Sequence, residues 1–298
     1  DAARLIAEGR LVAFPTETVY GLGARMDDAA VVARIFEAKG RPASNPLIAH
    51  VASVDAARAL CAEWTPSADA LSQLWPGPLT LVVRRASGVP DHATAGLDTL
   101  GVRVPSHPLA LEMLRACGFP VAAPSANRSG RPSPTTAHAV LDDLAGRIDA
   151  VLQGPQSQTG LESTVVDVSQ GEAVVLRPGS VTLDDLRAAW PAARMGRPDD
   201  ATERSPGTRF RHYAPHARVH IDALGDAPRW WIGIGSPHDP SAFAVVHALP
   251  DVETYARALF AFFREADAGG AASITCASVA ADGVGVALMD LIERAAEG

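Results

Sequence analysis

Cysteine and long apolar runs are both scarce in this chain. Its 298 residues include three cysteines, Cys61, Cys117 and Cys276, which lie far apart and match neither a metal-binding spacing nor a disulfide framework. No stretch approaches the ~20 consecutive apolar residues that a membrane-spanning helix needs, and the first residues lack the basic-then-apolar pattern of a secretory signal. The sequence therefore predicts a soluble protein of the reducing cytoplasm that does not engage a membrane.

Common signatures of covalent and nucleotide chemistry are also missing. There is no Gly-x-x-x-x-Gly-Lys-Ser/Thr loop, and Gly21-x-Gly23 lacks the third glycine of a dinucleotide-binding turn. Paired catalytic carboxylates, a Cys–His dyad and a Gly-x-Ser-x-Gly elbow are not found either. A bound nucleotide would have to be held by scattered cations and hydroxyl groups. The formal net charge of −8 argues against broad nucleic-acid binding, although it leaves room for a local basic cleft.

The chain is longer than one hydrophobic core usually serves, which favours two domains. Apolar strands followed by polar loops and helix-like runs predict a mixed α/β sheet in residues 1–190. Residues 191–217 shift to proline, glycine, arginine and aspartate without apolar periodicity, as a linker does. Residues 218–298 return to strand and helix patterns and predict a smaller α/β domain.

The most informative stretch runs from Lys39 to His50. A helix-like run over residues 28–38 leads Lys39 and Arg41 into a loop that two prolines stiffen around Asn45. An apolar strand that carries His50 follows. A stiff loop of lysine, arginine and asparagine between a helix and a strand predicts an anion site. A solvated helix C-terminus, where basic residues suit the helix dipole, explains the same pattern equally well.

Three further segments place polar groups beside apolar strands. Residues 15–23 carry Thr16 and Thr18 directly after a strand, and residues 124–134 form a proline-stiffened loop of serine, asparagine and arginine. Arg103 stands between two valines in a short strand. Each has an ordinary explanation, as a hydroxyl-rich turn, a surface loop or a solvent-facing arginine. Because α/β folds bind ligands at strand ends, the same groups also predict a site that positions a phosphorylated ligand and stabilises its charge.

Five motifs together resemble one family. In chain order they are Pro15-Thr-Glu-Thr-Val-Tyr-Gly-Leu-Gly, Lys39-Gly-Arg-Pro-x-x-Asn-Pro-Leu, Trp75-Pro-Gly-Pro-Leu-Thr, Ala123-Pro-Ser-Ala-Asn-Arg-Ser-Gly and Pro206-Gly-x-x-x-x-His-Tyr-Ala-Pro215. With these motifs the chain is similar to the L-threonylcarbamoyl-adenylate synthases of the YrdC-like family, in their two-domain form. The resemblance covers most of the chain up to Ala217 and fades beyond it.

The resemblance implies a fold and a reaction. The expected fold is a YrdC-like twisted mixed sheet with helices, joined by a long linker to a smaller Rossmann-like α/β domain. The expected reaction makes L-threonylcarbamoyl-AMP and pyrophosphate from L-threonine, bicarbonate and ATP, with Mg²⁺ accompanying ATP. The family's product serves a separate transferase complex that modifies adenosine 37 of ANN-decoding tRNAs, so that complex or tRNA is an expected partner.

The resemblance also implies roles for individual residues. Lys39 and Arg41 are the expected catalytic pair, and no protein ligand for a metal is expected. The expected ATP-binding residues are Lys39, Arg41, Asn45, Thr99, Ser125, Asn127, Ser133, Arg177 and Tyr213. The expected threonine-binding residues are Thr18, His50, Arg103, Ala123 and Ser163. Tyr213 belongs to the linker motif, which we expect to close over the nucleotide.

Three alternatives come from other functional classes. One is a non-catalytic RNA-binding module, against which the net acidity and the lack of interleaved aromatic residues count. Another is a carbamoyl transferase of hydrogenase maturation, which shares the fold but normally carries zinc-binding domains that this sequence lacks. The third is a structural subunit that has lost activity, which the intact motifs disfavour.

Overall fold

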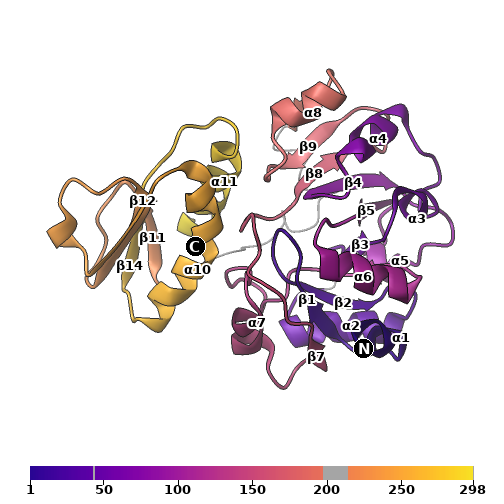
Figure 1. Ribbon diagram of the computed structural model, residues 1–298, viewed down its shortest axis with the longest axis horizontal. Coiled ribbons are helices and arrows are strands. Elements are labelled where there is room, and N and C mark those ends of the chain that lie inside the picture. Colours follow the sequence, from indigo (N-terminus) through magenta and orange to yellow (C-terminus); the bar gives the residue numbers. More distant parts are fainter. Residues whose placement is uncertain (43, 197–213, 298) are drawn as a thin grey trace.

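The computed structural model describes residues 1–42, 44–196 and 214–297, which form two α/β units (Figure 1). The strands of the first unit are β1 (Val12–Phe14), β2 (Gly21–Arg25), β3 (Ile48–His50), β4 (Leu79–Arg84), β5 (Thr99–Arg103), β6 (Val121–Ala122), β7 (Ala150–Val151), β8 (Thr164–Asp167), β9 (Val174–Arg177) and β10 (Arg194–Met195). Its helices are α1 (Ala2–Ala7), α2 (Ala29–Lys39), α3 (Val54–Arg58), α4 (Pro66–Leu71), α5 (Asp91–Thr94), α6 (Pro108–Cys117), α7 (Ala137–Leu144) and α8 (Leu183–Ala189), with a 3₁₀ turn η1 (Ser72–Leu74).

These strands form one mixed sheet in the order β10-β9-β8-β4-β5-β3-β6-β2-β1-β7. Parallel pairs such as β3–β5 and β4–β8 alternate with antiparallel pairs such as β4–β5 and β3–β6. The register pairs His50 with Arg103 across β3 and β5. The mixed sheet predicted from the sequence is confirmed, and the pairing explains how motifs far apart in the chain reach one place.

Helix α2 delivers the basic stretch because both of its ends are capped. The Asp28 side chain accepts from the backbone N–H groups of Ala30 and Val31. At the other end Gly40 takes a left-handed conformation with φ of 62°, which glycine adopts without steric cost. The helix buries an apolar face against the sheet, so its last residue, Lys39, points into the domain.

The second unit has strands β11 (Arg218–Ile221), β12 (Arg229–Ile234), β13 (Val245–Leu249) and β14 (Ser273–Cys276), helices α10 (Val252–Ala268) and α11 (Gly285–Ala296), and a 3₁₀ turn η2 (Pro240–Ala242). Its sheet is parallel throughout, in the order β11-β14-β12-β13. The core is rich in aromatic side chains from α10, namely Tyr255, Phe260, Phe262 and Phe263. Figure 1 shows α10 and α11 on the side of this sheet that faces the first unit.

The predicted linker, residues 191–217, begins differently from the expectation. Arg194 and Met195 form strand β10, which pairs with β9 and extends the first sheet. Residues 197–213, and with them Tyr213 and most of the expected closing motif, lie outside the described residues. Within the described ranges, no helix combines the length and apolar character needed to cross a bilayer.

Candidate active site

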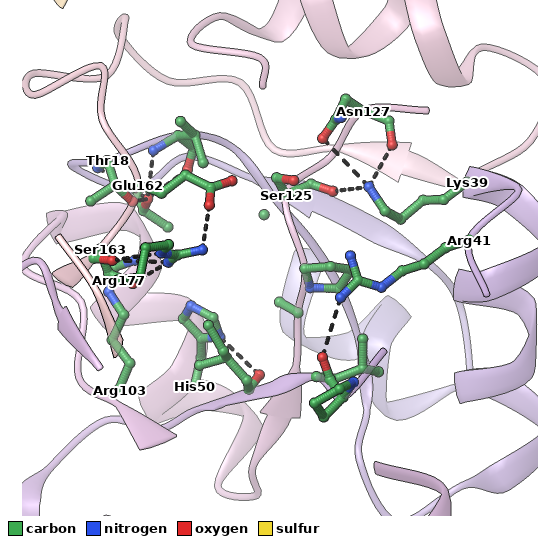
Figure 2. A pocket seen from close by; sticks show the side chains of 18 of the residues that line it. Thr18, Lys39, Arg41, His50, Arg103, Ser125, Asn127, Glu162, Ser163 and Arg177 are labelled. Carbon is green, nitrogen blue, oxygen red and sulfur yellow. Dashed lines mark hydrogen bonds and ion pairs between the residues drawn. The ribbon is translucent and has the colours of Figure 1, made fainter. Parts of the chain in front are cut away.

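A cavity of about 730 Å³, part of which opens to solvent, lies where the polar loops of the first unit converge. Figure 2 shows its labelled side chains around an empty centre, with Lys39, Arg41 and Asn127 on one side and Arg103, Arg177 and Glu162 on the other. The predicted site residues that line it are Thr18, Lys39, Arg41, His50, Arg103, Ala123, Ser125, Asn127, Ser163 and Arg177. Concave sites at which a few placed polar groups converge hold small ligands.

Lys39 is only 2% exposed, and its ammonium group contacts three acceptor oxygens of the protein. Its ammonium donates to the carbonyl oxygens of Ser125 and Asn127, each at 2.5 Å, and lies 3.4 Å from Asn127 Oδ1. Burial, and then the nearby charge of Arg41, hold the pKa of Lys39 well below its usual value. A solvated helix end is therefore the wrong explanation for Lys39, which ties helix α2 to the loop that follows β6.

Arg41 and the loop after β6 complete this side of the cavity. The Arg41 Nη2 donates to the carbonyl oxygen of Pro46 at 3.2 Å, which holds the guanidinium at the cavity wall. The Asn127 side-chain amide donates to the carbonyl oxygens of Arg128 and Arg131, at 2.9 and 2.7 Å. The loop is thereby closed on itself, and Arg41 presents positive charge beside the cavity.

Arg103 lies at the end of β5, on the other side of the cavity, and forms a buried ion pair. Its Nη2 donates to Glu17 Oε1 at 2.6 Å, and both side chains are 5% exposed. The Arg103 Nε is buried and has no hydrogen-bond partner among the described residues. Arg103 also lines the cavity, so its guanidinium places positive charge on this wall.

Arg177, at the end of β9, binds the segment just before β8. Its guanidinium donates to the Ser163 carbonyl oxygen at 2.9 and 3.1 Å, to Ser163 Oγ at 3.1 Å, and to Glu162 Oε2. Glu162 Oε1 accepts from Ser133 Oγ at 3.1 Å. Thr80, from the Trp75 motif, lies 2.8 Å from Ser163 through its hydroxyl. Four segments of the chain thus fix Ser163 and Arg177 at the cavity wall.

His50 is neutral and has a defined tautomer. Burial, assisted by the charge of Arg103, lowers its pKa from 6.5 to about 3. Its Nδ1 lies 3.2 Å from the Ile48 carbonyl oxygen, which can only accept, so Nδ1 carries the proton and Nε2 is an acceptor.

The two threonine hydroxyls of the loop after β1 bind each other. Thr16 Oγ1 donates to the Val19 carbonyl oxygen at 2.5 Å and lies 2.8 Å from Thr18 Oγ1. The Thr18 hydroxyl is therefore the donor in the contact between the two threonines.

Three of the predicted site residues that the structure describes are not in the cavity lining. Asn45 is buried in the loop between α2 and β3, and Thr99 is at the start of β5, at the opposite end of that strand from Arg103. Ser133 reaches the wall indirectly, through Glu162. Tyr213 lies outside the described residues.

Two acidic residues were not anticipated from the sequence. Glu17 and Glu162 balance Arg103 and Arg177, and Glu162 also lines the cavity. Glu17 stands inside the Pro15 motif, and Glu162 lies two residues before the apolar strand β8. A carboxylate next to a buried strand is a usable signal, since such groups are rarely buried without a partner.

This geometry suits charge stabilisation and positioning more than acid–base chemistry. Two basic sides face one cavity, separated by hydroxyl groups and a neutral imidazole. An arginine can bind a carboxylate in bidentate fashion, and preorganised cations stabilise the charge that develops in phosphoryl or nucleotidyl transfer. The arrangement therefore suits the binding of an anionic ligand and a carboxylate ligand side by side.

Comparisons with known proteins agree with this arrangement. Residues 4–179 match the Sua5, YciO and YrdC family described as "Telomere recombination", and residues 181–297 match "Threonylcarbamoyl-AMP synthase, C-terminal domain". A threonylcarbamoyl-AMP synthase of Pyrococcus abyssi is 41% identical over 99% of this chain and 92% of its own length. One from Bacillus subtilis is 43% identical over 74% of this chain and 65% of its own length.

A solved structure agrees over the whole chain. The crystal structure of P. abyssi Sua5 complexed with L-threonine superposes with a TM-score of 0.91 at 40% identity, covering 99% of this chain and 93% of that one. The chain therefore belongs to the Sua5/YrdC family, in the form that also carries the Sua5 C-terminal domain. As a member it is an enzyme of the threonylcarbamoyl-AMP synthase type, a transferase with nucleotidyltransferase-like activity.

Proposed function

We propose that the enzyme makes L-threonylcarbamoyl-AMP and pyrophosphate from L-threonine, bicarbonate and ATP. The observation that carries the proposal is the pair of basic sides on one cavity, of which one presents the Arg103 guanidinium beside His50 and Ser163. Arg103 would bind the threonine carboxylate, while Lys39 and Arg41 would form the nucleotide side. The relatives carry the name of this synthase, and one of them was solved with L-threonine.

The chemistry divides into two balanced steps. The threonine amine attacks the carbon of bicarbonate, and water leaves, which gives an N-carboxylate. An oxygen of this carboxylate then attacks the α-phosphorus of ATP, the bond from that phosphorus to the bridging oxygen breaks, and pyrophosphate departs. Arg41 would offset the charge that accumulates on the phosphates.

The threonine side chain has its own partners in this proposal. The neutral His50 Nε2 can accept a hydrogen bond, and the Thr18 and Ser163 hydroxyls lie on the same cavity. A site that binds the substrate hydroxyl with buried polar groups rejects analogues lacking it far better than an apolar pocket does. Because burial and the charge of Arg103 lower the pKa of His50, its imidazole is too weakly basic to deprotonate the threonine ammonium.

ATP would enter as its Mg²⁺ complex. Among the described residues there is no cluster of three potential metal ligands, and the one carboxylate in the cavity lining, Glu162, is engaged by Arg177 and Ser133. The described part of the chain thus offers no cage for the ion, which suits Mg²⁺ held by phosphate oxygens and water.

We extend the proposal to the product's use. The threonylcarbamoyl group would be passed on by a separate transferase complex to adenosine 37 of ANN-decoding tRNAs, and the reaction would take place in the cytoplasm. The three free cysteines are compatible with a reducing compartment.

The test is an assay of pyrophosphate release with ATP, Mg²⁺, bicarbonate and L-threonine, each omitted in turn. We expect release to require both threonine and bicarbonate, with a threonylcarbamoyl-AMP peak in the mass spectrum. Pyrophosphate release that does not depend on threonine would indicate a nucleotide hydrolase and contradict the proposal.

A substitution tests the role of Arg41. Arg41→Ala should lower kcat by about 10²-fold or more, whereas Arg115→Ala, which changes an exposed arginine of α6, should leave kcat unchanged.

A further inference from the structure

Helix α10 of the second unit packs directly against segments that form the cavity wall. Val19 and Leu161 belong to the first unit, yet both are buried in the hydrophobic core that α10 builds with the second sheet. Val19 also lines the cavity. One side chain therefore faces the ligand space and the core of the second unit.

Gly160 packs closely against the backbone of α10. Its φ of +68° is a conformation that residues with a side chain rarely adopt, and an added Cβ would lie 2.5 Å from Arg257 Cα and 2.7 Å from the Arg257 carbonyl oxygen. The Arg257 Nε donates to the Gln158 carbonyl oxygen at 2.7 Å. Two residues beyond Gly160, Glu162 makes its contacts with Arg177 and Ser133.

The same segment, residues 157–163, is tied to the loop after β1. Ser157 Oγ donates to the Thr16 carbonyl oxygen at 3.0 Å, and the Thr159 N–H donates to the Glu17 carbonyl oxygen at 2.9 Å. The 157–163 segment therefore connects α10 to the loop that holds Glu17 and Thr18. Displacement of this segment would move groups on the Arg103 side of the cavity.

Arg264, further along α10, holds the other loop of the cavity. Its guanidinium binds both carboxylate oxygens of Asp143 on α7, at 3.3 and 2.9 Å, and donates to the Pro132 carbonyl oxygen. The Asp143 side chain is fully buried, and it also accepts from the Arg128 N–H at 3.2 Å. Pro132 immediately precedes Ser133, the partner of Glu162.

We propose that α10 is a positioning element of the active site: it holds the 157–163 segment and the 128–133 loop so that Glu162, Ser133 and Arg177 meet at the cavity wall. The second unit thus acts on the reaction through residues that touch no substrate. This inference rests on the proposed function for its kinetic tests, but its binding and exchange tests do not depend on turnover.

The first test substitutes Gly160→Ala, with Gly171→Ala as the matched control. Gly171 has a similar φ of +83° but no atom within 4 Å of an added Cβ, so the control carries the backbone strain without the contact with α10. Both variants should lose thermal stability. Only Gly160→Ala should weaken L-threonine binding in calorimetry and raise the KM for L-threonine and for ATP, by about tenfold, within the usual range of coupling between sites.

The second test substitutes Arg264→Gln, with Arg294→Gln as control. Arg294 also binds an aspartate, Asp290, but within α11 and away from the cavity. Arg264→Gln should speed amide hydrogen exchange in residues 128–133 and 157–163 and weaken threonine binding, whereas Arg294→Gln should do neither.

The outcomes separate the two proposals. Unchanged exchange, threonine affinity and KM in Gly160→Ala and Arg264→Gln would overturn the positioning role, whatever the activity of the parent enzyme. Normal threonine binding without pyrophosphate release in the parent enzyme would instead refute the proposed reaction, while the exchange and affinity changes would still decide the role of α10.

Discussion

At the scale of single residues, the site is built from charges that are balanced before a ligand arrives. Arg103 and Arg177 line the cavity. Glu17, outside the lining, pairs with Arg103, and Glu162, within the lining, pairs with Arg177. A buried ion pair adds little net stability, but removing one partner leaves an uncompensated charge. The acidic partners therefore orient the two arginines at the cavity wall.

Glu17→Gln tests this balance. The substitution keeps the shape of the side chain but removes its charge, so Arg103 loses its ionic partner at 2.6 Å. We expect a destabilisation of about 3 kcal/mol and an increase in the KM for L-threonine that clearly exceeds the increase for ATP. Steady-state kinetics and thermal unfolding measure both effects. Glu17→Asp, which keeps the charge, should recover most of the threonine affinity, and equal KM changes for the two substrates would contradict the assignment.

At the scale of elements, one side chain connects helix α2 to the loop after β6. Lys39 is the chain's only lysine, whereas the other 25 residues of the Lys and Arg set are arginines. Its three donors converge on acceptors of Ser125 and Asn127. A compact ammonium fits that buried position, and the larger planar guanidinium does not.

Lys39→Arg should consequently behave as a disruptive change. We expect overpacking to cost about 1–3 kcal/mol and the loop to shift, with a loss in kcat/KM for ATP comparable to that of Lys39→Met. Denaturant unfolding and steady-state kinetics check the two parts. Near-normal activity of Lys39→Arg would show that charge alone matters at this position.

The sequence predicted the elements and the convergence of polar loops, but not the contacts between charges. Lys39, Arg41, Ser125 and Asn127 could be grouped because they match motifs of the family that the chain resembles, in segments that follow a patterned helix and a patterned strand. The partner of Arg103 could not be identified, because Glu17 lies 86 positions away in the sequence. The hydrophobic pattern of a chain predicts its helices and strands but does not show which loops lie next to each other in the fold. The burial of Leu161 in the core of the second unit could not be predicted either, because it depends on how the two folded units pack against each other.

At the scale of the whole molecule, burial of the site makes stability depend on pH. The pKa of His50 is about 3 in the folded protein and near 6.5 when the residue is exposed. Between these values the unfolded chain takes up a proton that the folded chain does not. The free energy of unfolding therefore falls as the pH falls through this window, by at most on the order of 5 kcal/mol from this group.

His50→Asn should flatten that dependence. The asparagine amide can still donate to the Ile48 carbonyl oxygen, but it does not titrate. In urea unfolding at pH 7, 5.5 and 4, the free energy of unfolding should fall less with decreasing pH for the variant than for the parent protein. An equal decline in the free energy of unfolding of both proteins would mean that other groups cause the acid sensitivity. His107, whose pKa is also lowered by burial, is one such group.

The single lysine has a consequence for chemical modification of the chain. Acylating and other amine-directed reagents find no lysine on the outer surface of these 298 residues, because the one ε-amine is buried on the Arg41 side of the cavity. The arginine-rich surface is inert to them at neutral pH, since guanidinium groups stay protonated. Selective ¹⁵N labelling of lysine would likewise yield one side-chain NMR signal, a direct reporter of whether that side of the cavity is occupied.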